Sequence, residues 1–328
     1  MRPPAEIPTR AVLTIATTKR VYFRMAVALA RSFALWNRNE GIAFHIVTDM
    51  DVALPRDLAF VTLNRIPPGA LGAGFSSKLQ LDRIAPASRT LFIDADCLCF
   101  GNLANVFERF AGKSICVVGG TISSGEWFGN VSEICARFDV VELPKFNGGI
   151  YYLEPGSVAS SVYERARALE LEYDAIGLRR LRGRPNDELL MAIAMAENHC
   201  RALPDDGTIL GDLYACPELV ELDVLLGRCR MLNPPFPHKS HRPWYPTGEI
   251  RPLVAHFLGN FTESWNYRAE ELALYLKSAS QCPSETARLI ARLVVLYPGR
   301  AIETAKNKLR PIYHWVFGVR SIGANKRM

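Results

Sequence analysis

The feature that most constrains this chain is an apolar segment, residues 90–100, that is interrupted by two carboxylates. It reads TLFIDADCLCF, so the apolar run ends at Asp94 and Asp96 and then resumes. Such a run is typical of a strand covered on both faces of a sheet. Side chains two apart on extended chain point the same way, so both carboxylates can converge on one point. Carboxylate oxygens at a strand end are suitable ligands for Mg²⁺ or Mn²⁺ carrying a phosphate. The alternative is the start of a loop, because Asp also favours turns.

Length and composition indicate a globular protein with one unusual segment. The chain has 328 residues, of which 49% are hydrophobic and 22% charged. This suits one large α/β domain, or one domain with an appendage. Residues 284–328 hold nine lysines and arginines but only two acids, so the segment carries +7 and the rest of the chain about −1. A body without a basic face argues against nucleic acid as the main partner.

Cysteine usage and hydropathy predict a cytosolic protein. The eight cysteines include no Cys-x-x-Cys pair, which argues against a zinc site or a redox pair. Cys97, Cys99 and Cys116 lie in apolar runs and are expected to be small core residues. Residues 1–9 lack the apolar core of a signal peptide, and no run approaches the ~18 apolar residues of a membrane-spanning helix.

The first part of the chain predicts a mostly parallel sheet. Residues 11–16, 44–48 and 60–63 read as strands, and residues 21–36 have the periodicity of a helix. Strand, helix and strand at this spacing are typical of parallel pairing. Polar residues directly after the first strand lie where such sheets bind ligands.

Further helices and strands are expected along the rest of the chain. We expect helices at residues 75–84, 102–110, 157–169, 187–196, 267–278 and 284–296, and short strands at 114–118, 150–153 and 254–258. Residues 205–250 are expected to be rich in loops. His238 and His241 lie there three apart, but nothing near them in the sequence completes a metal site. His45 is expected to be an ordinary sheet residue.

Two polar positions could serve a ligand or be ordinary surface features. Lys78 is expected near the start of a helix, where a cation opposes the helix dipole and a nearby phosphate would explain it. An exposed surface lysine is the alternative. Asn147, Gly148 and Gly149 precede an apolar strand. The glycines allow a ligand close to the backbone and the amide can bind a hydroxyl, although an ordinary turn would have the same sequence.

The basic C-terminal segment is expected to be helical at its start. Tyr313, Trp315 and Phe317 lie among its basic residues. A basic tail with interleaved aromatic residues can dock at an anionic membrane surface. The alternative is a solvated tail or one that faces a partner.

Three segments, in this order, resemble the retaining glycosyltransferases of family 8. Residues 77–79 and 91–96, followed by Asn-Leu and Val-Phe at 102–103 and 106–107, resemble the family's "KL … LYLDADVLV … DL … LF". Residues 146–150, FNGGI, resemble "FNSGVLL", and residues 256–259, HFLG, resemble "HFxGxxKPW". The resemblance spans roughly residues 10–265. It implies the GT-A fold, a Rossmann-like, mostly parallel central sheet flanked by helices, here with a basic helical C-terminal tail.

The resemblance also implies roles for individual residues. Asp94, Asp96 and His256 would hold Mn²⁺ or Mg²⁺, which would bridge the phosphates of a nucleoside diphosphate sugar. The donor would further contact Ala16, Thr17, Lys78, Ala95, Asn147, Gly148 and Gly259, and the catalytic groups would be Asp187, Asn147 and Lys78.

Two departures from the family pattern leave questions open. The register of its Asp-Gln pair is uncertain by one residue, so Asn186 or Glu188 is the alternative to Asp187. The lysine of "KPW" has no counterpart, because NFTESW follows Gly259. Another cation must therefore replace it, or the leaving group is less stabilised.

The resemblance predicts a metal-dependent glycosyltransferase. It would move a hexose, with retention, from a nucleoside diphosphate sugar (UDP-sugar first) to a hydroxyl acceptor. The basic tail indicates a glycan or glycolipid of the cell envelope as that acceptor. Residues 1–280 would form the transferase domain, with a nucleotide-binding half at 10–110 and an acceptor and donor-sugar half at 111–280. Residues 281–328 would be a basic helical appendage.

Two other functions are weighed against this one. A sugar nucleotidyltransferase would need a Gly-rich basic loop near the N-terminus, and ATTKR at residues 16–20 has no glycine. A non-catalytic nucleotide-sugar-binding protein with a degenerate site is supported by the missing lysine. The intact set of Asp94, Asp96 and His256 speaks against it.

Overall fold

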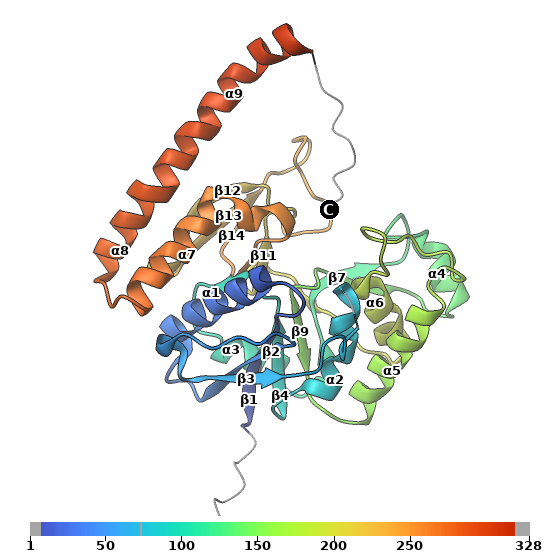
Figure 1. The fold of residues 1–328 in the computed structure, drawn as a ribbon. Helices are drawn as coiled ribbons and strands as arrows, with labels where there is room; N and C mark the ends of the chain where they lie inside the picture. Colours follow the sequence, from blue (N-terminus) through green and yellow to red (C-terminus); the bar gives the residue numbers. More distant parts are fainter. Residues whose placement is uncertain (1–7, 73, 319–328) are drawn as a thin grey trace, which may run out of the picture.

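A six-stranded sheet forms the centre of the computed structural model, which describes residues 8–72 and 74–318 (Figure 1). Its strands, in spatial order, are β3 (Val61–Arg65), β2 (Ile42–Thr48), β1 (Arg10–Ile15), β4 (Arg89–Ile93), β9 (Ile150–Leu153) and β6 (Ile115–Cys116). Strands β1 to β4 are parallel to one another, and β9 runs antiparallel to both β4 and β6. The prediction of an α/β fold with a mostly parallel sheet is confirmed.

Strand β4 is buried on both faces, as its sequence predicts. Leu91 and Ile93 lie in one core with α1 (Arg20–Asn37), and Phe92 lies in a second core with α5 (Ser157–Leu171). Successive strand residues point to opposite faces, so a strand between two cores needs an apolar residue at every position. These three side chains are therefore almost completely buried.

The remaining helices flank this sheet or extend from it. They are α2 (Leu81–Ile84), α3 (Ala104–Phe110), α4 (Val131–Arg137), α6 (Asp187–Glu197), α7 (Trp265–Ser278), α8 (Ser284–Ala291) and α9 (Tyr297–Phe317). Short 3-10 helices occur at Arg56–Leu58, Gly74–Gln80, Val224–Leu226 and Gly259–Glu263, and a π-helical turn at Arg292–Leu296 joins α8 to α9.

The segment with the two carboxylates contributes to two different sheets. After β4 the chain turns and forms β5 (Cys97–Cys99), which pairs antiparallel with β15 (Val254–His256). Strand β15 also pairs, in parallel, with β11 (Leu210–Asp212). The resumption of the apolar run is therefore a second buried strand. Asp94 and Asp96 lie at the junction between the two sheets.

The expectation of a loop-rich stretch at residues 205–250 is wrong in part. Besides β11 it contains an antiparallel sheet of β12 (Glu218–Asp223), β13 (Arg228–Asn233) and β14 (Gly248–Ile250). Adjacent apolar residues, Leu219-Val220 and Met231-Leu232, break the alternation of β12 and β13, and their pairing shifts register between Leu219 and Glu221. Without regular alternation, the sequence gives little signal for a strand. A further small sheet contains β10 (Leu203–Pro204), β7 (Val118–Ile122) and β8 (Leu143–Phe146).

The α-helix expected at residues 75–84 is mostly a 3-10 helix. Gly74–Gln80 is 3-10 and only Leu81–Ile84 is α-helical. The Lys78 ammonium is fixed by Asp94 and by the Gly148 carbonyl. Contacts with distant parts of the chain thus override the local helical preference here.

The C-terminal helices are longer and better anchored than the sequence predicts. Arg288 Nε and Arg292 Nη2 lie 2.7 and 2.9 Å from Asp223 Oδ2, whose side chain is only 4% exposed. Gly299 packs on Trp265, because a Cβ there would lie 2.0 Å from the indole Cγ. Beyond this point α9 projects from the body (Figure 1). Within the described residues, we find no helix with the length and apolar character needed to cross a membrane.

Candidate functional site

Polar side chains from distant segments meet beyond the end of β4. The turn into β5 carries Asp94 and Asp96, and β15 ends at His256. The backbone N–H of Asp94 donates to Gly149 O at 2.9 Å, and that of Phe257 donates to Asp96 O at 2.9 Å. These backbone bonds fix the acidic turn against the two neighbouring segments.

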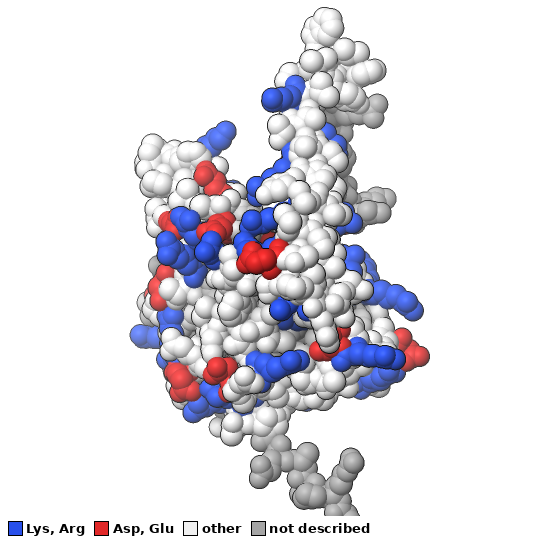
Figure 2. Space-filling view, turned by 90° about the vertical axis from the view of Figure 1, so that its left-hand side faces the viewer, with Lys and Arg blue, Asp and Glu red and all other residues white. Residues whose placement is uncertain are grey.

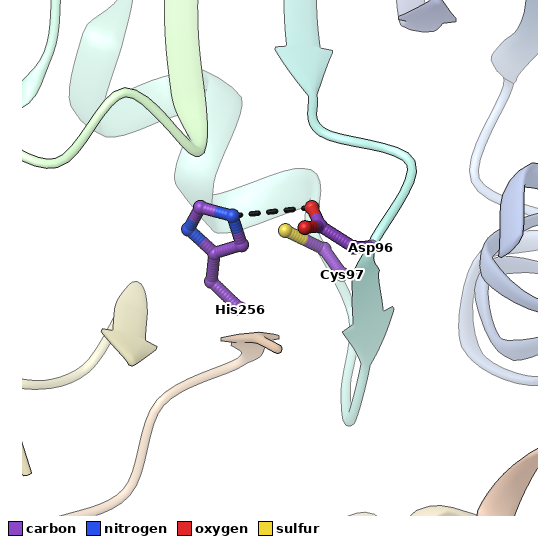
Figure 3. Close-up of side chains that lie close together, drawn as sticks. All are labelled: Asp96, Cys97 and His256. Carbon is purple, nitrogen blue, oxygen red and sulfur yellow. Dashed lines mark ion pairs between the residues drawn. The ribbon is translucent and has the colours of Figure 1, made fainter. Parts of the chain in front are cut away.

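Asp94, Asp96 and His256 are close enough to share one ligand. His256 Nε2 lies 3.1 Å from Asp96 Oδ1 and 3.7 Å from Asp94 Oδ2. The side chains of Asp94 and Asp96 are 20% and 24% exposed, so both carboxylates remain accessible from solvent. Figure 3 shows His256 and Asp96 facing each other across the cluster, with Cys97 beside them.

The donor set of this cluster suits a hard divalent cation. Ligand atoms of Asp96, Cys97 and His256 all lie within 4.8 Å of one another. Burial holds the pKa of the Cys97 thiol well above its usual range, so it stays protonated. Only a thiolate is a good metal ligand. Asp96 and His256 remain, and Asp94, 3.7 Å from His256 Nε2, can add a second carboxylate of the kind that Mn²⁺ or Mg²⁺ binds.

The electrostatics of the cluster also favour a cation. Burial lowers the pKa of His256, but Asp96 and then Asp94 outweigh it and raise that pKa to about 9. Burial raises the pKa of Asp94 despite the opposing effect of Lys78. For Asp96 burial is outweighed chiefly by His256, and its pKa is lowered. The acids thus hold a proton on the imidazole where a divalent ion could take its place.

Lys78 is a buried partner of the acids and not an exposed surface lysine. Its Nζ lies 2.7 Å from Asp94 Oδ2, 2.8 Å from Gly148 O and 3.7 Å from Asp187 Oδ2. Burial opposes its charge, but Asp187 and Asp94 outweigh this and raise its pKa. The ammonium therefore links the end of β4, the glycine turn and the start of α6.

Asn147 orients His256 through its amide oxygen. That oxygen lies 2.8 Å from His256 Nδ1 and accepts from Gly149 N at 2.8 Å. An amide oxygen only accepts, so Nδ1 must carry a proton and Nε2 faces the acids. A side chain at Gly149 would lie 2.6 Å from His256 Nδ1, so only glycine fits here.

Asp212 belongs to this network and was missed by the sequence analysis. Its Oδ2 accepts from Asn147 Nδ2 at 3.0 Å, and its Oδ1 accepts from Tyr214 N and Ala215 N at 2.8 and 2.7 Å. It ends β11, within the stretch expected to be loop-rich. The sequence would have indicated Asp212 only if the three-residue strand β11 had been predicted.

The start of α6 contributes two acids. The Asn186 side chain accepts from Leu189 N at 2.9 Å through its Oδ1 and caps the helix. Asp187 Oδ2 accepts from Tyr151 OH at 2.8 Å, and Glu188 Oε1 accepts from Gly148 N at 2.8 Å. Burial, followed by Asp187, raises the pKa of Glu188 to about 7.

The other predicted residues lie at the edges of this cluster. Ala16 follows β1, and its carbonyl accepts from Thr48 Oγ1 at 2.7 Å. Because β1 and β4 are parallel, the residues that follow them, Thr17 and Asp94, lie at the same edge of the sheet. Ala95 is nearly buried between the two acids. Gly259 has a φ of +63° and begins a 3-10 helix three residues after His256. In residues 8–72 and 74–318, no hydrogen bond joins Ala16, Thr17 or Gly259 to Asp94, Asp96 or His256.

The remaining histidines that the sequence analysis discussed, His45, His238 and His241, make local contacts. His45 is 9% exposed in β2 and bonds Asn64 at 3.2 Å, as an ordinary sheet residue does. His241 Nδ1 lies 2.8 Å from Pro234 O, and His238 Nδ1 accepts from Ser240 N at 3.2 Å. Both nitrogens thus serve the local turn. All eight cysteines are free thiols.

Among known proteins, this chain shows similarity only to solved structures. No protein-family model matches the sequence, and no curated protein matches it. The galactosyltransferase LgtC aligns with 76% of this chain and 87% of its own, at 11% identity and a TM-score of 0.47. Mouse xyloside xylosyltransferase 1 aligns with 62% of this chain and 88% of its own, at 17% identity and a TM-score of 0.43.

A third similar structure is the glycosyltransferase GlyE of Streptococcus pneumoniae. It aligns with 60% of this chain, at 14% identity and a TM-score of 0.39, and this chain spans 45% of its length. All of these identities and TM-scores are low. The case for a function therefore rests on the side chains of the site.

Proposed function

We propose that this chain is a metal-dependent glycosyltransferase that takes a hexose from a nucleoside diphosphate sugar, with UDP-sugar as the first donor to test. The observation that carries the proposal is the convergence of Asp94, Asp96 and His256 on one accessible point. Asp94, Asp96 and His256 would hold a divalent ion there, and that ion would supply Lewis-acid stabilisation of the departing diphosphate. Hydrolysis by paired carboxylates is less well supported, because glycosidase acids lie on opposite sides of the scissile bond.

Each neighbouring side chain has a part in this proposal. Asn147 and Asp212 keep the His256 Nε2 lone pair directed at the metal position, which is how outer partners of a metal site tune it. Lys78 balances the charge of Asp94 and Asp187. Ala16 and Thr17 border the nucleoside, and Ala95, Gly148 and Gly259 line the donor through their backbone.

The reaction exchanges one bond for another at the anomeric carbon. Its bond to the diphosphate oxygen breaks, the acceptor hydroxyl oxygen bonds to the same carbon, and the diphosphate takes the hydroxyl proton. We propose that attack occurs on the face that the diphosphate leaves, so that the configuration is retained. Asp187 and Glu188, which lie against Gly148, would stabilise positive charge on the sugar.

A donor screen tests this function. Purified protein is incubated with Mn²⁺, a panel of nucleoside diphosphate sugars and a mixture of glycan and glycolipid acceptors. We expect release of one nucleoside diphosphate, abolished by Asp96→Asn and unchanged by Asp206→Asn, an exposed acid paired with Arg109. Pyrophosphate production from a nucleoside triphosphate and a sugar phosphate would favour the nucleotidyltransferase. Binding of a donor without any turnover would favour the binding protein.

The surface of α9 supports an acceptor located at a membrane. Ile302, Ala305, Leu309, Ile312 and Val316 recur every three or four residues and so share one face. Leu309, Ile312 and Val316 are 58%, 59% and 54% exposed.

Charge on α9 complements an anionic membrane. Helical geometry places Lys306 and Lys308 at the two margins of the apolar face, where lysines can reach lipid headgroups. Glu303 is the one acid between Tyr297 and Phe317. Figure 2 shows basic side chains spaced along the column that projects from the body. We therefore propose that α9 lies on an anionic membrane and brings the site to a glycolipid acceptor.

Vesicle co-sedimentation tests the membrane contact. The protein should pellet with vesicles that contain phosphatidylglycerol and less with pure phosphatidylcholine. Leu309→Glu with Ile312→Glu should prevent pelleting. A matched control, Val141→Glu with Leu171→Glu, places the same charges at positions 88% and 90% exposed outside α9 and should pellet like the wild type. Equal pelleting of all variants would count against the proposal.

The division of the chain follows from the same proposal. Residues 10–110 would bind the nucleotide, residues 111–280 the donor sugar and acceptor, and residues 281–328 would form the membrane-facing appendage.

A further inference from the structure

A tight turn before α6 directs two arginine side chains at the two segments that carry His256 and Lys78. Leu181 and Arg184 pair through both backbone hydrogen bonds, at 2.8 and 3.0 Å. The turn places Arg182 at a φ of +54° and Gly183 at +76°. A left-handed backbone at a residue other than glycine is costly and is concentrated at functional positions.

Each arginine rests on a glycine. Arg182 Nη2 would lie 3.3 Å from a Cβ built on Gly259, which comes three residues after His256. Arg184 Nη1 would lie 2.8 Å from a Cβ on Gly74, which comes four residues before Lys78. Both glycines have a positive φ, +63° and +68°. The two guanidinium groups therefore lie against the backbone of two different segments, one that follows His256 and one that leads to Lys78.

These two arginines differ from their neighbours in the same loop. Arg179 Nη2 lies 2.6 Å from Glu126, and Arg180 is held by both oxygens of Asp174 at 2.8 and 2.7 Å. Arg182 and Arg184 are exposed, and their guanidinium groups form no ion pair or hydrogen bond with any residue of the described ranges. They are the cations of this loop that remain available to a ligand.

The site needs such cations if it is to take a diphosphate. Its acids are Asp94, Asp96, Asp187, Glu188 and Asp212. Of its own cations, Lys78 is already occupied by Asp94, Asp187 and the Gly148 carbonyl. If a divalent ion replaces the proton on His256, that ion and Lys78 are the positive charges left at the site to offset these acids and two phosphates. Arginines beside the site that no acid neutralises would add the positive charge that a diphosphate needs.

We propose that Arg182 and Arg184 bind the diphosphate of the donor from the two flanks of the site. The inference rests on the proposed function and adds to it the residues that recognise the phosphates. A planar guanidinium can donate two parallel hydrogen bonds to one phosphate. The tight turn presents both groups with little loss of freedom, and the bare glycine backbones let them approach the segments of His256 and Lys78.

Calorimetry with two probes tests the inference. Inorganic pyrophosphate with Mn²⁺ reports on phosphate binding independently of the base, and UDP with Mn²⁺ reports on the nucleotide. Loss of a charged hydrogen bond weakens binding by about tenfold or more. We therefore expect Arg182→Gln and Arg184→Gln each to raise the Kd of both probes about tenfold, with part of the affinity kept in Arg182→Lys.

The paired arginines of the same loop are the matched controls. Arg179→Gln and Arg180→Gln should leave both Kd values within about twofold, because their charges are already neutralised by acids. Wild-type affinity in Arg182→Gln and Arg184→Gln would overturn the inference while leaving the proposed function intact. A wild-type protein that binds neither probe would overturn the proposed function itself, together with this inference.

Discussion

The candidate site and helix α9 place charged and apolar groups in opposite ways. At the site, Lys78, Asp94 and His256 are drawn into the interior and contact one another. On α9, Leu309 and Ile312 face solvent, and beyond Gly299 the helix has few neighbours. Burying charge is tolerated only where opposite charges compensate it, and exposed apolar area indicates a contact surface. The first region is therefore suited to ions and phosphates, and the second to an apolar surface with negative charge.

The largest effect on stability should come from breaking the charge balance of the site. Lys78→Met leaves the buried Asp187 and the partly exposed Asp94 without their shared cation. Removing one partner of a buried ion pair costs about 3–5 kcal/mol. Denaturant unfolding measures this loss, with Lys113→Met as the control because Lys113 is exposed. A loss equal to that of the control would show that the acids are not held by Lys78.

The anchor of the C-terminal helices should be the next most sensitive position. Asp223→Asn removes the carboxylate shared by Arg288 and Arg292. We expect the free energy of unfolding to fall by about 3 kcal/mol, and the junction between α7 and α9 to become open to limited proteolysis. Glu285→Gln tests the exposed partner of Arg288, 79% exposed, and should cost less than about 1 kcal/mol. Equal effects of both variants would contradict a buried anchor.

A buried acid close to this anchor should make stability depend on pH. Burial raises the pKa of Glu270 to about 8, and its carboxylate accepts from Val224 N at 2.7 Å. The folded state binds this proton more tightly than the unfolded state. The stabilisation is thus complete below the ordinary pKa near 4.5 and is lost as the pH rises through about 8.

The slope of this loss can be measured. It should not exceed about 1.4 kcal/mol per pH unit for a single proton. Glu270→Gln should reduce the slope by the share of this one proton and leave the contributions of Glu188 and His256, whose pKa values are also raised. Glu303→Gln, on the exposed part of α9, should leave the slope unchanged. A wild-type profile that is flat between pH 5 and about 8 would contradict a buried, protonated Glu270.

The smallest effect on stability is expected on α9. Leu309→Glu with Ile312→Glu changes side chains that are already exposed, so the free energy of unfolding should change by no more than about 0.5 kcal/mol. Thermal unfolding measures it. A large loss would mean that this face packs on the protein, and the contrast between the two regions would then disappear.

Residues at the ends of regular strands could be predicted from the sequence. Asp94 and Asp96 follow the apolar run of residues 91–93, and His256 ends a short apolar strand, so the pattern of apolar residues located all three. Their mutual distances could not be predicted in this way, because Asp96 and His256 lie 160 positions apart in the sequence. The order of segments that resembles a known family supplied that link.

Other parts of the site depend on contacts that local sequence does not encode. Asp212 lies on a three-residue strand that exists because β15 pairs with it. Lys78 lies in a 3-10 helix that is fixed by distant acids. Arg288 and Arg292 have the spacing of surface residues, yet both bind an aspartate more than 60 residues away. In each case a long-range partner, absent from the local pattern, decides the conformation.

The central claim is that Asp94, Asp96 and His256 hold a divalent ion that carries a diphosphate. Isothermal titration calorimetry of UDP in Mn²⁺ and in EDTA tests it most directly. The wild type should bind UDP in Mn²⁺ and lose most of that affinity in EDTA. Asp96→Asn should bind equally weakly in both, while Asp206→Asn should behave as the wild type. Binding of UDP with the same affinity in EDTA, or its persistence in Asp96→Asn, would contradict the account.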